Sequence, residues 1–150
     1  MEQRDALTAY NDVYKEQEEL YRAAIRRCGL SDCAFWVLYA LRDAGRPLTQ
    51  SDICTAVYQP KQTVHSSLKK LLEEDVLRLT EGRDRRSKYL VLTAAGEALT
   101  ARTVDRVTAA EETAMDALTA EERTRLLLLF RRYNAALRQA LSTAIEEKKE

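Results

Sequence analysis

The chain has 150 residues, and its 24 basic and 24 acidic side chains give a formal net charge of zero. Hydrophobic residues make up 45%, and only four Gly and two Pro occur, which favours one mainly helical domain and argues against an all-β sandwich or a disordered chain. No apolar run, Leu126–Phe130 included, is long enough to span a membrane, and the polar start Met1–Asp5 does not resemble a secretory signal. We therefore expect a cytoplasmic protein with no membrane partner.

Helical periodicity covers the N-terminal third of the chain. Apolar side chains recur at helical spacing through residues 5–28, which predicts an amphipathic helix that stops at Gly29. Ser31 suits the N-cap of a second helix over residues 32–43. The centre of that helix, Phe35–Leu41, is apolar nearly all round, so we expect it to be buried on several sides or to face a cavity.

Two further helices are predicted before residue 76. Thr49–Asp52 fits a capping box, which indicates the start of a short helix. Pro60 suits the first turn of the next helix, which extends to about Asp75. One side of that helix is apolar and predicted to face inward, whereas the other side is polar with no acid before Glu73. The polar side consists of Lys61, Gln62, Thr63, His65, Ser66 and Lys69.

The apolar period then changes from helical to alternating. We interpret Leu77–Thr80 and Tyr89–Leu92 as segments with a period of two residues, which predicts a β-hairpin. The connecting loop is longer than usual hairpin loops and strongly cationic, so we expect it to be functional. This tip, residues 81–88, carries Arg83, Asp84, Arg85, Arg86 and Lys88.

Two long helices are predicted to complete the chain. Thr93 is expected to cap one helix that continues to about Leu118. A second capping box, Thr119–Glu122, begins the last helix, which extends to Ile145. Its apolar stripe follows the helical repeat and consists of Leu126, Phe130, Tyr133, Leu137, Leu141 and Ile145.

The order of these elements predicts a fold that is mainly α with a small β-hairpin wing. Residues 31–93 form the expected winged helix-turn-helix lobe, whose second helix would lie in the major groove of double-stranded DNA. Gln62 suits a bidentate contact to adenine, and Lys61 and Lys69 suit guanine or phosphate. The arginines of the wing suit the negative potential of the adjacent minor groove. We further expect Asp84 to pair with Arg86 and to fix its direction.

The first and last helices must bury their apolar stripes against some other surface. The lobe can fill its own core without them, so residues 5–28 and 97–145 are predicted to be dimerisation helices of a two-fold homodimer. Two recognition helices would then lie about one turn of DNA apart.

The sequence resembles the MarR family of winged helix-turn-helix regulators. Pro60–Val64 opens the recognition helix as in that family, and Asp84–Gly96 matches its wing pattern D-x-R-x(5)-L-T-x-x-G. The segment Leu118–Glu122 is also similar to the start of the family's last helix. The resemblance implies a homodimeric regulator, most often a repressor, on a pseudo-palindromic operator. It also implies release by a small phenolic or lipophilic effector, or by cysteine oxidation.

Candidate sensor residues follow from that resemblance. In the family the effector cavity lies between the DNA-binding lobe and the dimer helices, which makes Trp36, Tyr39 and Tyr14 candidates, although such aromatics are more often core. Cys28 and Cys33 are redox candidates, and Arg26 and Arg27 would favour a reactive thiolate at Cys28; the alternative is that the cysteines are small buried hydrophobes.

Catalysis is not expected from this sequence. No G-x-S-x-G, H-E-x-x-H, C-x-x-C or P-loop motif occurs, the cysteine spacing suits zinc poorly, and His65 is the only histidine, so we expect no enzyme activity, metal or cofactor. Two alternatives stay open: a redox-gated regulator of the same fold, and a winged helix that binds proteins. A protein-binding wing would favour exposed apolar residues at the tip, and residues 81–88 contain none.

Overall fold

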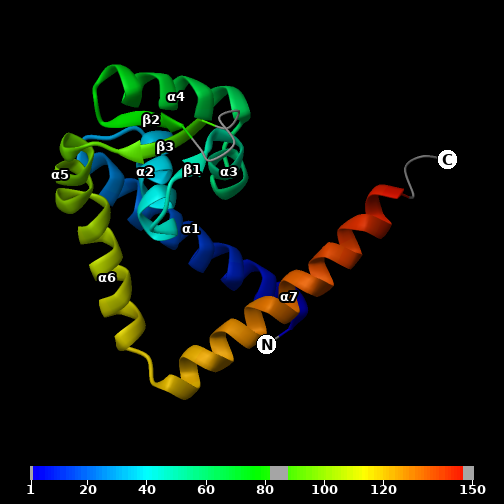
Figure 1. Cartoon of the computed structure of the whole chain (residues 1–150). Helices are drawn as coiled ribbons and strands as arrows, with labels where there is room; N and C mark the ends of the chain where they lie inside the picture. The colour runs from blue at the N-terminus through cyan, green and yellow to red at the C-terminus, as the bar shows by residue number, and fades with distance from the viewer. Residues whose placement is uncertain (1, 82–87, 147–150) are drawn as a thin grey trace. The chain divides into compact units, whose positions relative to one another are not determined.

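The computed structural model describes residues 2–81 and 88–146, and it confirms a mainly helical fold with a small sheet (Figure 1). The chain forms two compact units, residues 1–108 and 109–150. In chain order the elements are α1 (Gln3–Cys28), α2 (Asp32–Ala44), β1 (Leu48–Thr49), α3 (Gln50–Ala56), α4 (Lys61–Glu73), β2 (Leu77–Glu81), β3 (Lys88–Leu92), α5 (Ala94–Arg102), α6 (Val104–Asp116) and α7 (Ala120–Glu146).

The core of the first unit is built around α2. As its apolar sequence predicted, this helix is buried on several sides, against α3, α4 and α5. Phe35, Val37 and Leu38 are fully buried, and Ile53 of α3 and Val64 of α4 meet them in the same cluster. The lobe therefore completes a hydrophobic core from residues 25–104.

The predicted helix caps are present. Ser31 Oγ accepts a hydrogen bond from the backbone N–H of Ala34 at 3.2 Å, which begins α2. At α3 the N–H of Asp52 donates to Thr49 Oγ1, and the N–H of Thr49 donates to Asp52 Oδ2, so the capping box is reciprocal. Pro60 is the N-cap of α4 rather than a residue of its first turn, because its ψ of 137° is extended.

The sheet has three strands instead of the predicted two. Its order is β1-β3-β2, and Leu48 pairs with Leu90 while Leu77 pairs with Leu92. The prediction of an isolated hairpin was therefore incomplete. A strand of two residues is too short to show an alternating pattern, and it ends where the capping box of α3 begins.

The L-T-x-x-G part of the wing pattern joins the sheet to α5. Thr93 Oγ1 accepts from the N–H of Gly96 at 3.0 Å, and the N–H of Thr93 donates to the carbonyl of Val76. A Cβ at Gly96 would lie 2.1 Å from that same carbonyl oxygen. Glycine is therefore required because the first turn of α5 packs directly on the backbone that leads into β2.

The single long helix predicted from Thr93 to Leu118 is wrong, because the helix breaks at Thr103. This residue has φ −124° and ψ −82°, so α5 ends there and α6 begins with the next residue. The Thr103 hydroxyl donates to the carbonyl of Leu99 at 2.6 Å, and both Thr100 and Thr103 are buried. Threonine side chains that bond to the preceding turn favour such a bend, which the apolar periodicity does not reveal.

The second unit contains the end of α6 and the whole of α7. A reciprocal capping box begins α7, as predicted, because the N–H of Thr119 donates to Glu122 Oε2 at 2.8 Å and the N–H of Glu122 donates to Thr119 Oγ1. Arg123 closes the turn between the helices through Asp116 at 2.9 Å. None of the side chains of residues 120–145 is buried. Within residues 2–81 and 88–146, no helix has a stretch apolar enough to cross a lipid bilayer.

Candidate nucleic-acid interface

The recognition helix α4 has one buried and one exposed face. Val64, Leu68 and Leu71 are buried in the lobe and hold the helix in place. The six polar residues predicted to meet DNA are all exposed, so the structure brings them together on the outer side of the lobe: Lys61, Gln62, Thr63, His65, Ser66 and Lys69. An exposed row of donors on a rigid helix is the geometry that base and phosphate contacts need.

The end of α4 is fixed by a Schellman motif that sequence reading missed. The N–H of Val76 donates to the carbonyl of Leu71 at 2.9 Å, and the N–H of Asp75 donates to that of Leu72 at 3.2 Å. Asp75 takes a left-handed conformation with φ 54°, which Asp tolerates better than most residues. The motif turns the chain from α4 into β2, and it thereby sets the angle between recognition helix and wing.

The histidine of α4 is held by a side chain of α3. Gln50 Nε2 lies 3.1 Å from His65 Nδ1. An amide nitrogen can only donate, so this contact makes Nδ1 the acceptor and leaves the ring proton of a neutral His65 on Nε2. The outward nitrogen is then a donor, which suits phosphate oxygen or the acceptors of guanine. The sequence reading singled out His65 but missed Gln50, whose only visible signal was its place in a capping box.

Two further polar residues of α4 have partners on the helix itself. Ser66 Oγ donates to the carbonyl of Gln62 at 3.0 Å, so the hydroxyl offers its lone pairs outward. Lys69 Nζ lies 3.8 Å from Glu73 Oε1, and both side chains are largely exposed. Such a surface ion pair is weak and gives way readily to a phosphate.

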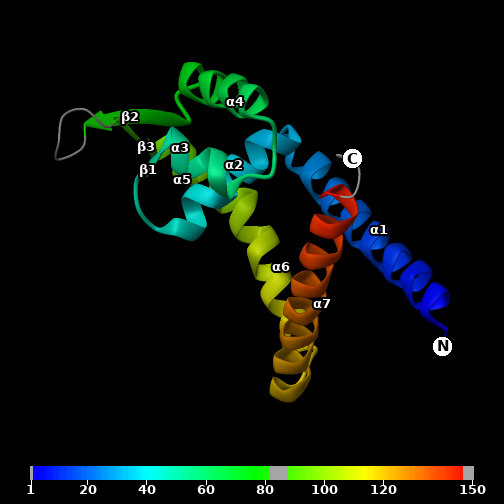
Figure 2. The same ribbon diagram turned by 90° about the vertical axis from the view of Figure 1, so that its right-hand side faces the viewer.

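The wing strands β2 and β3 extend sideways from the helices of the lobe (Figure 2). Lys88 is exposed at the start of β3 and pairs across the hairpin with Glu81. The other predicted wing residues, and with them the proposed Asp84–Arg86 pair, lie outside the described residues: Arg83, Asp84, Arg85 and Arg86.

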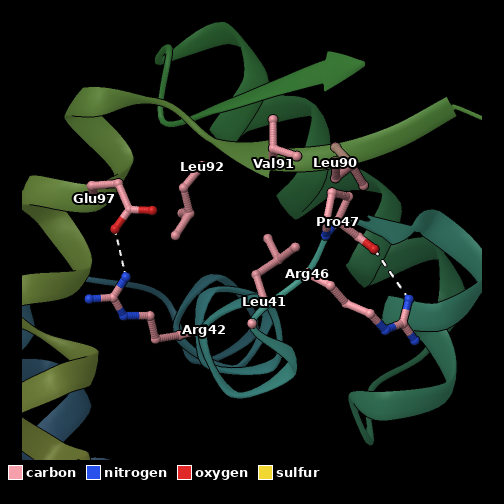
Figure 3. Close-up of a pocket in the computed structure, with 9 residues that line it drawn as sticks. Leu41, Arg42, Arg46, Pro47, Leu90, Val91, Leu92 and Glu97 are labelled. Atoms are coloured by element: carbon pink, nitrogen blue, oxygen red, sulfur yellow. Dashed lines mark hydrogen bonds and ion pairs between the residues drawn. The ribbon is translucent and has the colours of Figure 1, made fainter. Parts of the chain in front are cut away.

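An ion-pair network that the sequence did not predict connects α2 to α5 and α6. Arg42 donates to both carboxylate oxygens of Asp105, at 2.8 and 2.7 Å, and to Glu97 Oε2 at 2.6 Å. These hydrogen bonds to Asp105 and then its charge raise the pKa of Arg42. Figure 3 shows Arg42 facing Glu97, whereas Arg46 extends to the other side of Leu41. The network spans the break at Thr103 and ties α2 to α5 and to the first turn of α6.

That network borders a shallow pocket between the end of α2 and β3. The pocket has a volume of ≈ 290 Å³ and is lined on one side by Leu90–Leu92 and on the other by Leu41, Arg42 and Arg46. Arg46 donates to the carbonyl of Pro47 at 3.2 Å, and Arg42 is already paired with two carboxylates. Arg42 is thus compensated by two carboxylates, whereas the hydrogen bond of Arg46 to a neutral carbonyl leaves its positive charge in the pocket wall.

A second pocket collects two of the three aromatic effector candidates. It has a volume of ≈ 410 Å³ and lies between α2 and the chain that connects α3 to α4. Trp36 and Tyr39 line it, with ring centroids 5.4 Å apart, and Tyr21 of α1 packs on Trp36 from behind at 5.5 Å. Tyr14 is not among its lining residues and stacks on Tyr10 further along α1.

The two cysteine candidates differ in environment. Cys33 is only 6% exposed in the core of the lobe, and this burial raises the pKa of its thiol, which lowers the fraction of reactive thiolate. Cys28 is half-buried in the last turn of α1, beside Arg26 and Arg27. Burial therefore makes Cys33 the weaker sensor candidate of the two.

A short helix, a recognition helix and a paired wing in this order define a winged helix-turn-helix protein. Residues 29–87 match the sequence model described as the MarR family. No curated protein matches the chain. Together with the solved structures that follow, this match over residues 29–87 supports the resemblance to the MarR family seen in the sequence.

Several solved structures share the fold over most of their length. A MarR family regulator from Neisseria meningitidis is 26% identical, with a TM-score of 0.73 over 95% of this chain and 99% of its own. MepR of Staphylococcus aureus, solved in a complex with DNA, is 18% identical, with a TM-score of 0.69 over 86% and 94%. BpsR of Bordetella bronchiseptica, whose DNA binding is regulated by 6-hydroxynicotinic acid, is 23% identical, with a TM-score of 0.63 over 87% and 98%.

Proposed function

We propose that this chain is a transcriptional regulator that binds double-stranded DNA as a homodimer and acts as a ligand-responsive repressor. The observation that carries the proposal is the exposed polar face of α4, held rigidly on the lobe by three buried apolar residues. The wing supports it, because its strands are continuous with the lobe and its tip sequence is cationic. The likeness in fold to MepR, which was solved in a complex with DNA, points the same way.

The proposed dimer uses the two long helices. α1 buries only Ile25 and exposes Leu7, Val13 and Leu20, and α7 exposes five consecutive apolar residues, Leu126–Phe130. Apolar surface of this extent rarely stays in water in a stable protein. A two-fold contact through these helices would cover it and would present two copies of α4 to one face of DNA.

The effector response is proposed for the pocket lined by Trp36 and Tyr39. A ligand can release DNA only if it binds two shapes of the dimer with different affinity. This pocket is suitable because its other wall is the chain segment that leads directly into α4. The same lobe thus offers a ligand site and a DNA-binding face that share one short connection.

The test is a selection of bound sequences from a random duplex library, followed by fluorescence anisotropy at several salt concentrations. Because binding should release counterions, affinity should fall steeply with salt. Lys61→Ala should weaken DNA binding and reduce the slope of log affinity against log salt concentration by about one. The control Lys15→Ala on α1 should change neither the affinity nor this slope. Arg86→Ala should cost about 1–3 kcal/mol in the same assay. Equal slopes for Lys61→Ala, Lys15→Ala and the unchanged protein would contradict the assignment of α4.

A further inference from the structure

The pocket between α2 and the α3–α4 connection has a charge that defines its ligand. Its lining contains three aromatic rings, Trp36, Tyr39 and Tyr58, and one ionisable group of full charge at neutral pH, the Asp43 carboxylate. None of the described residues that line it is Lys or Arg. The pocket is therefore aromatic and acidic.

Two helix ends add to the negative potential of this pocket. Asp43 lies in the last turn of α2, and Ala56 is the last residue of α3, so the C-terminal turns of both helices contribute to its lining. Backbone carbonyls at a helix C-terminus carry partial negative charge and favour cations. Of the neighbouring arginines, Arg42 is paired with Asp105 and Glu97, and neither Arg42 nor Arg46 lines this pocket.

The position of Asp43 is locally unfavourable. An acidic side chain in the last turn of a helix opposes the helix dipole, and among the described residues Asp43 has no ion-pair partner. A residue that conflicts with its own helix often has a role outside folding. A bound cation would resolve this conflict.

Tyr58 supplies the open side of the pocket. Its side chain is 100% exposed, although a large aromatic side chain gains free energy when it is covered. Next to it, Gln59 Nε2 donates to Asp32 Oδ2 at 3.1 Å and ties the connection to the start of α2. The ring of Tyr58 can thus close over a ligand that lies on Trp36 and Tyr39. Meanwhile the Gln59–Asp32 hydrogen bond keeps the α3–α4 connection attached to α2.

From this arrangement we infer that the pocket binds an organic cation with an aromatic or quaternary ammonium group. Cations bind to aromatic faces by attraction to the ring quadrupole, and the volume of ≈ 410 Å³ lies in the range of small-molecule sites. The inference rests on the ligand response of the proposed function, and it is narrower than the small phenolic or lipophilic effector that the family resemblance implies. Asp43 repels an anion, whereas it attracts a cation of the same shape.

The test uses the fluorescence of Trp36, the single tryptophan of the chain, in the absence of DNA. Three probes of similar size are titrated: phenyltrimethylammonium, its uncharged isostere tert-butylbenzene, and benzoate. The cation should bind about fivefold or more tightly than the isostere, and benzoate most weakly. Benzoate binding as tightly as the cation would overturn the inference.

Matched variants assign the effect to the pocket. Asp43→Asn should weaken binding of the cation about fivefold and leave the isostere unchanged. Asp12→Asn removes the same charge from an exposed position on α1 and should change neither. Tyr58→Ala should weaken the binding of both probes. Because the Tyr58 side chain is completely exposed, this substitution should leave the fold intact. Equal cation affinity in Asp43→Asn and Asp12→Asn would refute the inference.

The titration is independent of the proposed function, because it requires no DNA. If the cation binds as described but no duplex is bound in the library selection, the ligand site stands and the DNA-binding proposal fails. If duplex is bound but the cation is not preferred, the inference about the ligand fails alone. Circular dichroism of each variant confirms that binding is compared between folded proteins.

Discussion

Helices α2 and α7 are both rich in apolar residues, yet their surroundings are opposite. Six of the 13 residues of α2 are buried, whereas none of the described side chains of α7 is buried. The winged lobe therefore completes its own core, and α7 has apolar surface that the lobe core does not use. Apolar content alone thus predicts that a helix will be covered, but it does not say by what.

The largest expected effect concerns α7 and would distinguish its apolar surface from the core of the lobe. Replacing Leu126 and Leu137 by Ala should weaken the proposed dimer by about 5 kcal/mol or more, because each leucine buried at an interface contributes about 2–3 kcal/mol and the two are far enough apart to act additively. Sedimentation equilibrium measures this directly. The lobe should keep its helical structure.

Leu79→Ala is the matched control for that double variant. Leu79 lies on β2 and is 48% exposed, compared with 40% for Leu126 and 39% for Leu137. It should leave association unchanged. If the double variant associates as strongly as this control, the apolar surface of α7 has another purpose and the proposed dimer is wrong.

The second effect tests whether the lobe depends on its internal packing. Gly96→Ala would place a Cβ 2.1 Å from the carbonyl oxygen of Val76, which cannot move without disturbing β2. We expect a loss of about 3 kcal/mol in the free energy of unfolding, measured by urea denaturation.

Gly45→Ala is the control, because Gly45 also needs a special conformation but has open space around it. Its φ is 59°, and no atom lies within 4 Å of a Cβ there. This substitution should cost about 1 kcal/mol through backbone strain alone. Equal losses at both glycines would show that the close approach of α5 to Val76 has been overestimated.

The lobe was more predictable from sequence than its connections to the rest of the chain. Caps such as Ser31 and the Thr49–Asp52 box are short-range signals, and they are where the sequence places them. The Arg42–Asp105 pair depends on residues that meet only after folding, because they are 63 positions apart in the chain. No local pattern carries that information.

The candidate site shows the same division. The polar face of α4 follows from helical periodicity, so its six exposed residues could be predicted. The Gln50–His65 contact and the acidic pocket could not, because each joins residues of different helices. Trp36 and Tyr39 were found as aromatics, and Asp43 lies one turn after Tyr39 on the same helix, but the pocket that they share with Tyr58 became visible only through the packing of α2 on the chain before α4.

The smallest expected effect compares the capping boxes of the two regions by pH. Hydrogen bonds from the backbone N–H and then the hydroxyl of Thr49 lower the pKa of Asp52, and those of Thr119 do the same for Glu122. A lowered folded-state pKa means that each box stabilises its helix above the unfolded-state pKa and loses that contribution as the pH falls through the folded-state value. Urea unfolding between pH 7 and about pH 3 should therefore show a smaller acid-induced loss of unfolding free energy in Asp52→Asn than in the unchanged protein.

Because α3 belongs to the cooperative lobe, Asp52→Asn should act on lobe unfolding, whereas Glu122→Gln should act on the helicity of α7. The same acid-induced loss of lobe stability with and without Asp52 would show that its capping box does not contribute to the pH dependence.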